Sequence, residues 1–122
     1  MALTREQERA KLAHRQVVAV SERSEKEQRK YRTITRKAQA LIRNAGLCQA
    51  LHFIESKKDY QQLRKDIQAH LEKHMGLEGD ILANLREKME LSEYLGTTRE
   101  VLRCLTWQCR MVDALLGEGS DD

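Results

Sequence analysis

Residues 24–46, SEKEQRKYRTITRKAQALIRNAG, carry the signals of one complete helix. Ser24 and Glu27 have the Ser-x-x-Glu spacing of a capping box, which satisfies free amides at a helix start. Gly46 can take the positive-φ conformation that ends a helix. Apolar residues recur between them at intervals of three and four, which predicts one buried stripe: Tyr31, Ile34, Ala38, Leu41 and Ala45.

The same segment carries basic residues on its other side. At about 100° per residue, four arginines fall opposite the apolar stripe and two lysines flank them: Arg29, Arg32, Arg36, Arg43, Lys30 and Lys37. One interpretation is a solvated helix surface, and the other is a surface that binds phosphate groups. No acid occurs between Glu27 and Glu55, and this favours the second interpretation because solvated helices usually mix both signs.

The composition favours helix throughout the chain. It contains no proline, few aromatic residues and 34% charged residues, and its length of 122 residues suits one domain. We therefore expect an all-α, single-domain bundle of about five to six helices. The domain would span residues 1–117, and residues 118–122 would form a disordered acidic tail.

The net charge of +3 is concentrated in one region. Residues 28–54 hold six basic and no acidic side chains, so the remainder of the chain has 16 basic against 19 acidic ones. This distribution predicts one surface for an anionic partner rather than a polybasic tail.

The other helices follow from similar patterns. Thr4 and Gln7 begin a first helix over 4–23, whose early turns are free to project beyond the core. Asp59 and Asp80 are expected caps, and residues 92–96 are expected to break the chain before a third capping box at Thr97 and Glu100. The last helix has two apolar stripes and should lie at the centre of the bundle. The remaining segments expected as helices are 47–56, 59–75, 80–91 and 97–116.

The chain is expected to be soluble and cytoplasmic. No apolar run approaches the roughly 18 residues that span a bilayer, and residues 4–15 are too charged for a signal peptide. Cys48, Cys104 and Cys109 form no CxxC pair, so we interpret them as buried free thiols.

We find no convincing catalytic or metal motif. His70 and His74 are four residues apart, but the zincin glutamate is not in its place and no third ligand is evident, so both are interpreted as surface histidines. Cys48 and His52 lie in an apolar run, where core packing is the better account. No cofactor or small-molecule substrate is expected, and the chain is not expected to be an enzyme.

The aromatic residues fall on apolar stripes or at helix junctions, where core packing is expected: Tyr31, Phe53, Tyr60, Tyr94 and Trp107. Any nucleic-acid contact should therefore be made to the backbone, with little base readout.

Three ordered segments resemble a known family: YRTITRKAQALIRNAGLCQALHFIESK, YQQLRKDIQAHL and LSEYLGTTREVLRCLTWQCRMVDALL. They are similar to the small helical subunit of the Cmr complex, the type III-B CRISPR effector that cleaves invading RNA. The correspondence covers most of residues 24–117. Gln108 and Cys109, after the tryptophan, and Ala45, after Asn44, depart from the family pattern.

The resemblance implies an all-helical subunit without enzymatic activity. Copies of it would stack along a filament of other Cmr subunits and contact the duplex of crRNA and target RNA. The residues matching the family's positive helix would be Arg29, Arg32, Arg36 and Arg43, with Lys57 in addition. No membrane partner is implied.

Three other functions remain open from the sequence. A DNA-binding regulator would use residues 24–56 as a helix-turn-helix, although the groove-reading positions in 47–54 would be largely apolar. A protein-assembly adaptor would use the basic face to meet an acidic partner. A small RNase would need His52 or His70 for acid-base catalysis.

Overall fold

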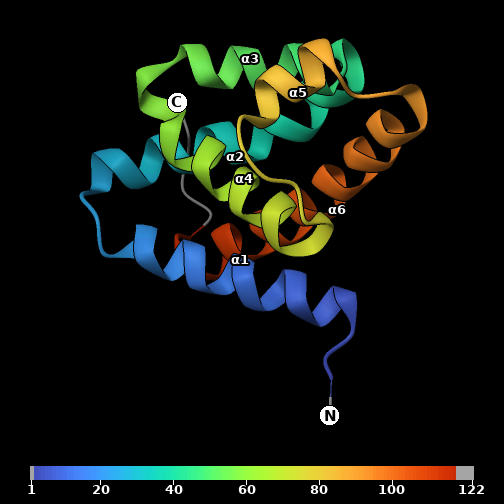
Figure 1. The fold of residues 1–122 in the computed structure, drawn as a ribbon. Coiled ribbons are helices and arrows are strands. Elements are labelled where there is room, and N and C mark those ends of the chain that lie inside the picture. Colours follow the sequence, from blue (N-terminus) through green and yellow to red (C-terminus); the bar gives the residue numbers. More distant parts are fainter. Residues whose placement is uncertain (1, 118–122) are drawn as a thin grey trace.

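The computed structural model describes residues 2–117, so the expected acidic tail at 118–122 lies outside the described residues. Within this range the chain is entirely helical apart from its connections, and the expected all-α bundle is confirmed. The elements are α1 (Arg5–Ser21), α2 (Glu25–Ala45), α3 (Leu47–Ser56), the 3₁₀ turn η1 (Lys58–Tyr60), α4 (Gln61–Met75), α5 (Ile81–Glu87) and α6 (Leu91–Leu115). In Figure 1, α1 lies along one side of the bundle, and α3 and α5 cover the opposite side. None of the described helices combines the length and apolar character needed to cross a lipid bilayer.

Three of the expected helix starts are confirmed. Thr4 forms a complete capping box with Gln7 at the start of α1. The Ser24 side chain accepts a hydrogen bond from the Glu27 amide, and Asp80 accepts one from the Ala83 amide. These caps satisfy amides that have no partner inside the helix.

The buried stripe of α2 differs from the expected one at its end. Tyr31, Ile34 and Ala38 are buried as expected, but the next buried apolar residue is Ile42. Leu41 is only half-buried, because it lies on the flank of the stripe. Ala45 is exposed: it is the last residue of α2, where the chain turns at Gly46 into α3.

The turn at Gly46 is stabilised from α6. Gly46 has φ +89°, which a residue with a side chain rarely adopts. The Cys48 amide, at the start of α3, donates a hydrogen bond to the Tyr94 hydroxyl at 2.8 Å. Tyr94 therefore serves as a cap for a helix that has no side-chain cap of its own.

The C-terminal helix α6 is central, as predicted, since it packs against α1, α2 and α4. Of the first expected stripe, Val101, Leu105 and Val112 are fully buried, but Cys109 is half-buried. The second expected stripe consists of Cys104, Trp107, Met111 and Leu115. Here Cys104 is buried, Trp107 and Met111 are half-buried, and Leu115 is exposed. Gln108 is completely buried between the two stripes.

The expected break at residues 92–96 is wrong. α6 begins at Leu91 and continues through Gly96, and the break lies instead between Glu87 and Leu91. Thr97 is buried within the helix, where its hydroxyl donates to the Glu93 carbonyl. Glu100 pairs with Arg9 of α1 and so does not complete a capping box.

Asp59 is also not the cap of α4. It lies in η1 and forms an ion pair with Lys30 at 2.9 Å, and Tyr60 takes the N-cap position without a side-chain hydrogen bond. The predicted break after α4 is confirmed, with Gly76 in the left-handed conformation.

The first turns of α1 contact the bundle. Arg5 donates a hydrogen bond to the His74 carbonyl at 2.9 Å, and Arg9 is buried against Glu100. Ala13, Val17 and Val20 continue the buried face of α1. The start of α1 is polar in sequence, and ion pairing rather than apolar contact holds it against the bundle.

Candidate nucleic-acid interface

The prediction that all four arginines of α2 face outward is wrong for Arg32. Its side chain is only 5% exposed, and it donates hydrogen bonds to the Leu116 carbonyl at 3.1 Å and to Glu25 at 3.3 Å. On the helix, Arg32 lies only about 100° from Tyr31, at the edge of the buried stripe. The end of α6 covers this edge, so Arg32 joins α2 to α6.

Carboxylates from other segments neutralise further basic residues of α2. Arg36 donates hydrogen bonds to Asp113 at 2.9 Å and to the Gly117 carbonyl at 3.1 Å. Lys30 pairs with Asp59. The absence of acids within the segment therefore does not leave all six cations unpaired, because the fold brings acids from distant parts of the chain.

Three basic residues of α2 keep the arrangement that the sequence predicts. Arg29, Lys37 and Arg43 are exposed and lie within about 60° of the direction opposite Tyr31. Among residues 2–117, none of the three has a carboxylate within 4.0 Å. We name these three residues the α2 cationic face.

Lys57 extends the exposed basic surface beyond α3. Its ammonium lies 5.3 Å from the centroid of the Phe53 ring, within the range of a cation–π contact. Phe53 itself is 42% exposed, so the expected core role of this residue is wrong. It occupies the solvent-facing side of α3, whose other face is buried through Leu51 and Ile54.

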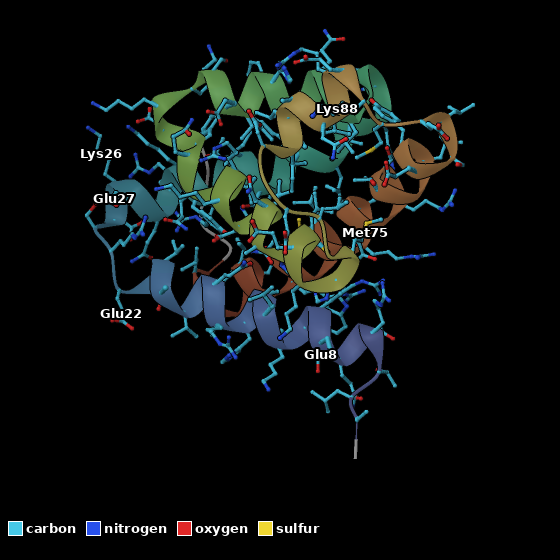
Figure 2. The ribbon with its side chains drawn as sticks, in the orientation of Figure 1. Glu8, Glu22, Lys26, Glu27, Met75 and Lys88 are labelled. Atoms are coloured by element: carbon cyan, nitrogen blue, oxygen red, sulfur yellow. The ribbon has the colours of Figure 1, made fainter. Side chains whose placement is uncertain are left out.

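A second basic region appears only in three dimensions. A groove of about 500 Å³ lies where the turn between α1 and α2 meets η1 and the start of α4. Figure 2 shows Lys26 and Glu27 on its α2 side, at the edge of the molecule. The groove has five basic side chains and two acidic ones: Arg23, Lys26, Lys30, Lys58 and Lys65, with Glu27 and Asp59. Sequence reasoning missed it because three separate segments contribute these residues.

The expectation that His70 and His74 are surface residues is wrong. His70 is only 1% exposed and His74 only 9%. A ring nitrogen of each lies 3.2 Å from the other, and His70 Nε2 lies 2.9 Å from Gln108 Oε1. The polar chain continues, since Gln108 donates to the Tyr31 hydroxyl at 2.8 Å and Tyr31 donates to Asp66 at 2.6 Å.

Burial shifts the pKa values in this polar chain. It lowers the pKa of His70 to about 4 and also lowers that of His74, because the charged imidazolium is poorly solvated there. It raises the pKa of Asp66, against the opposing effect of the Tyr31 hydrogen bond. It raises the pKa of Tyr31 as well, together with the nearby charge of Asp66.

Around Glu100, hydrogen bonds outweigh the effect of burial on the pKa of the carboxyl group. Burial would raise the pKa of this carboxyl, but two hydrogen bonds from Arg9, at 2.6 and 2.7 Å, lower the pKa to about 2. The Cys104 thiol also donates to Glu100, at 3.2 Å. Burial, followed by this carboxylate, raises the pKa of Cys104 above its ordinary value. Without a bound metal ion, such a thiol stays protonated and is a poor nucleophile.

Cys48 and His52 do not form a nucleophilic pair, because the His52 ring nitrogens have other partners than the Cys48 thiol. His52 Nδ1 lies 3.1 Å from the Cys48 backbone carbonyl, and its Nε2 lies 3.1 Å from Arg86. All three cysteines are free, but only Cys104 is fully buried. Cys48 and Cys109 are half-buried, in contrast to the expectation for all three.

The exposed side of α3 does not suit a recognition helix. Leu47, Ala50, Leu51 and Ile54 are buried against neighbouring helices. The exposed positions carry no cation: Gln49, Phe53, Glu55 and Ser56. This distribution disfavours the helix-turn-helix alternative, because such a helix meets a phosphate-lined groove.

Comparison with known proteins identifies the family. The family model described as "CRISPR-associated protein (Cas_Cmr5)" matches residues 5–115. The CRISPR system Cmr subunit Cmr5 of Thermus thermophilus is 38% identical over 90 residues, which cover 72% of this chain and 76% of that protein. A crystal structure of a CRISPR-associated Cmr5 family protein, also from Thermus thermophilus, superposes with a TM-score of 0.79 at 32% identity, covering 93% of this chain and 98% of that one. The match thus spans α1 through α6 in sequence and in fold, and the chain belongs to the Cmr5 family of CRISPR-associated proteins.

Proposed function

We propose that this protein is a non-catalytic subunit of a type III-B Cmr complex and contacts the backbone of the crRNA–target RNA duplex. Family membership supports the place in the complex. The α2 cationic face carries the RNA contact, because Arg29, Lys37 and Arg43 are exposed and have no carboxylate within 4.0 Å among the described residues.

The spacing of this face fits a polyanion. At 1.5 Å per residue, Arg29 and Lys37 lie about 12 Å apart along α2, and Arg43 lies about 9 Å further on. A nucleic-acid backbone can place phosphate groups against three cations along such a line. Phosphate contacts of this kind do not distinguish one base sequence from another. The groove beside η1 is a second basic region, with Lys26, Lys58 and Lys65 all exposed.

The geometry gives little support to an RNase. His70 cannot reach a phosphate from its buried position, and its lowered pKa leaves it neutral at pH 7. His52 is half-buried and contacts Arg86. Acid-base cleavage requires two groups within hydrogen-bond reach of one reacting phosphate.

Stacking along the complex is part of the same proposal. Leu91 and Leu95 are exposed near the start of α6, at 73% and 47%. Exposed leucines one helical turn apart suit a contact with another subunit or with a further copy of this chain.

The experiment is RNA binding by the assembled Cmr complex containing a charge-reversed subunit. The test variant is Arg29→Glu/Lys37→Glu/Arg43→Glu, and binding to labelled target RNA is measured by fluorescence anisotropy over a range of salt concentrations. The control variant is Lys11→Glu/Arg15→Glu/Lys88→Glu, which makes the same change in net charge on exposed residues of α1 and at the end of α5.

We expect the test variant to bind more weakly and to lose roughly two to three units of slope in log K against log salt, since each lost phosphate contact removes about 0.7 to 0.9 units. The control should keep most of the slope. Equal slopes for the wild type and the test variant, in complexes of the same subunit composition, would remove the α2 cationic face from the RNA contact. Equal loss in both variants would mean that only overall charge matters.

A further inference from the structure

A pair of histidines and a thiol meet in the core between α4 and α6. His70 and His74 come from α4, and Cys104 comes from α6; one ligand atom of each lies within 4.8 Å of the other two. His70 Nδ1 and His74 Nε2 are 3.2 Å apart. Two nitrogens bound to one tetrahedral zinc ion lie about 3.3 Å apart, as follows from bond lengths of about 2.05 Å. The histidine pair therefore already has the spacing of two ligands.

The buried hydrogen bonds determine which nitrogen of His70 carries its proton. Tyr31 donates its only proton to Asp66, so its oxygen accepts from the amide nitrogen of Gln108. The amide oxygen of Gln108 then faces His70 Nε2, and this contact is a hydrogen bond only if Nε2 is protonated. His70 Nδ1 consequently presents a lone pair to His74. Outer hydrogen bonds of this kind orient the histidine ligands of metal sites.

One carboxylate, Glu100, lies beside the thiol, and both Arg9 and Arg5 pair with it. Arg9 lies close to the site, but its two hydrogen bonds to Glu100 neutralise it. The Cys104 thiol donates to the same carboxylate. When a divalent ion binds, the sulfur–metal bond forms as the S–H bond breaks, and the proton leaves to solvent. His74 Nε2 donates its proton to His70 Nδ1 in the metal-free protein, so this proton must move to His74 Nδ1, by exchange with solvent, when Nε2 binds the ion. The ion then meets one thiolate and two neutral imidazoles.

One of the three ligands also borders the protein surface. A shallow depression on the side where α1 begins is lined by Leu3, Arg5, Glu8, Lys73 and His74. Figure 2 labels Glu8 and Met75 on this side of the molecule. His74 belongs both to the depression and to the buried cluster, so it is the ligand nearest to solvent.

We propose that His70, His74 and Cys104 form a binding site for a zinc-like divalent cation, which joins α4 to α6. Imidazole and thiolate ligands together select such ions over magnesium and calcium. For all three residues to bind one ion, Cys104 Sγ must come to about 3.6 Å from His70 Nδ1 and from His74 Nε2. This is the distance that zinc–ligand bond lengths imply. This site is separate from the α2 cationic face and goes beyond the proposed RNA contact.

The test is a titration of the folded, metal-free protein at pH 7. Cobalt(II) serves as the spectroscopic probe, because a tetrahedral thiolate site gives it a charge-transfer band and intense visible absorption. Zinc affinity follows by competition, and native mass spectrometry counts the ions. We expect one ion per chain, one proton released on binding and a higher Tm in zinc.

Matched cysteine variants on α6 locate the site. Cys104→Ala should weaken zinc binding by about 100-fold or more and abolish the cobalt charge-transfer band. Cys109→Ala removes the neighbouring half-buried thiol and should change the affinity less than about twofold. His74→Gln is a second test variant at the edge of the core, and it keeps both cysteines.

Circular dichroism melts of each variant confirm that it is folded before titration. Failure of the folded wild-type protein to bind either ion with one-to-one stoichiometry would overturn the proposal. Unchanged metal binding in a folded Cys104→Ala or a folded His74→Gln variant would also overturn the proposal. Neither result would bear on RNA binding by α2.

Discussion

Replacing Glu100 by glutamine should cost this protein a large part of its stability. Glu100 and Arg9 are buried, with side chains 5% and 10% exposed, and two hydrogen bonds between them hold α1 against α6. The pairing lowers the pKa of Glu100 from 4.5 to about 2, so the charged form gains about 3 kcal/mol in the folded state. The loss of one partner from a buried ion pair usually costs about 3–5 kcal/mol, because the other charge is left uncompensated.

The assay is urea unfolding at pH 7, followed by the helical circular dichroism signal. With a slope of about 2 kcal/mol per molar urea, Glu100→Gln should lower the midpoint by about 1.5 M. The control is Glu87→Gln, which removes the carboxylate of an exposed pair with Arg86. It should change the free energy of unfolding by less than about 0.5 kcal/mol.

A double variant tests whether the two groups act as a pair. Arg9→Met/Glu100→Leu removes both charges and should lie within about 1 kcal/mol of the wild type, since apolar replacement of a buried pair is often neutral. The stability losses of Arg9→Met and of Glu100→Leu alone are measured in the same way. If the loss in the double variant equalled their sum, the two groups would not be coupled and the reasoning would be wrong. Because the folded pKa of Glu100 is lowered, this stability is complete above about pH 4.5 and is lost as the pH falls towards 2.

Three further predictions follow from the buried polar residues. Burial lowers the pKa of His70 from 6.5 to about 4, so its contribution to stability is complete above about pH 6.5 and is lost as the pH falls towards 4. Urea unfolding should show that the free energy of unfolding of the wild type falls by about 2 kcal/mol between about pH 7 and 5 because of this residue. The fall should be smaller in His70→Gln, and parallel pH profiles for the two proteins would contradict this. Tyr31→Phe should destabilise by about 1–3 kcal/mol in the same assay, because Asp66 loses a buried hydrogen-bond donor, and an unchanged midpoint would refute that role. Arg32→Met should cost about 1–2 kcal/mol while Arg29→Met costs less than about 0.5 kcal/mol, and equal costs would show that Arg32 is not buried in solution.

The helical class and the main helix starts were predictable because they depend on short-range physics. Thr4, Ser24 and Asp80 cap their helices through residues only three positions away. The 3.6-residue period places Tyr31, Ile34 and Ala38 on one side of α2 whatever lies against them. The segments that indicate the Cmr5 family are likewise read directly from the order of residues.

The tertiary structure alone decided which polar residues are exposed. Arg36 meets Asp113 from 77 residues away, and Arg9 meets Glu100 from 91 residues away. No pattern within a helix contains these partners, because periodicity describes only which residues share a face and not what covers that face. The same physical reason explains why His70 and Cys104 came together unforeseen: helix packing, not spacing along the chain, brings α4 and α6 side by side.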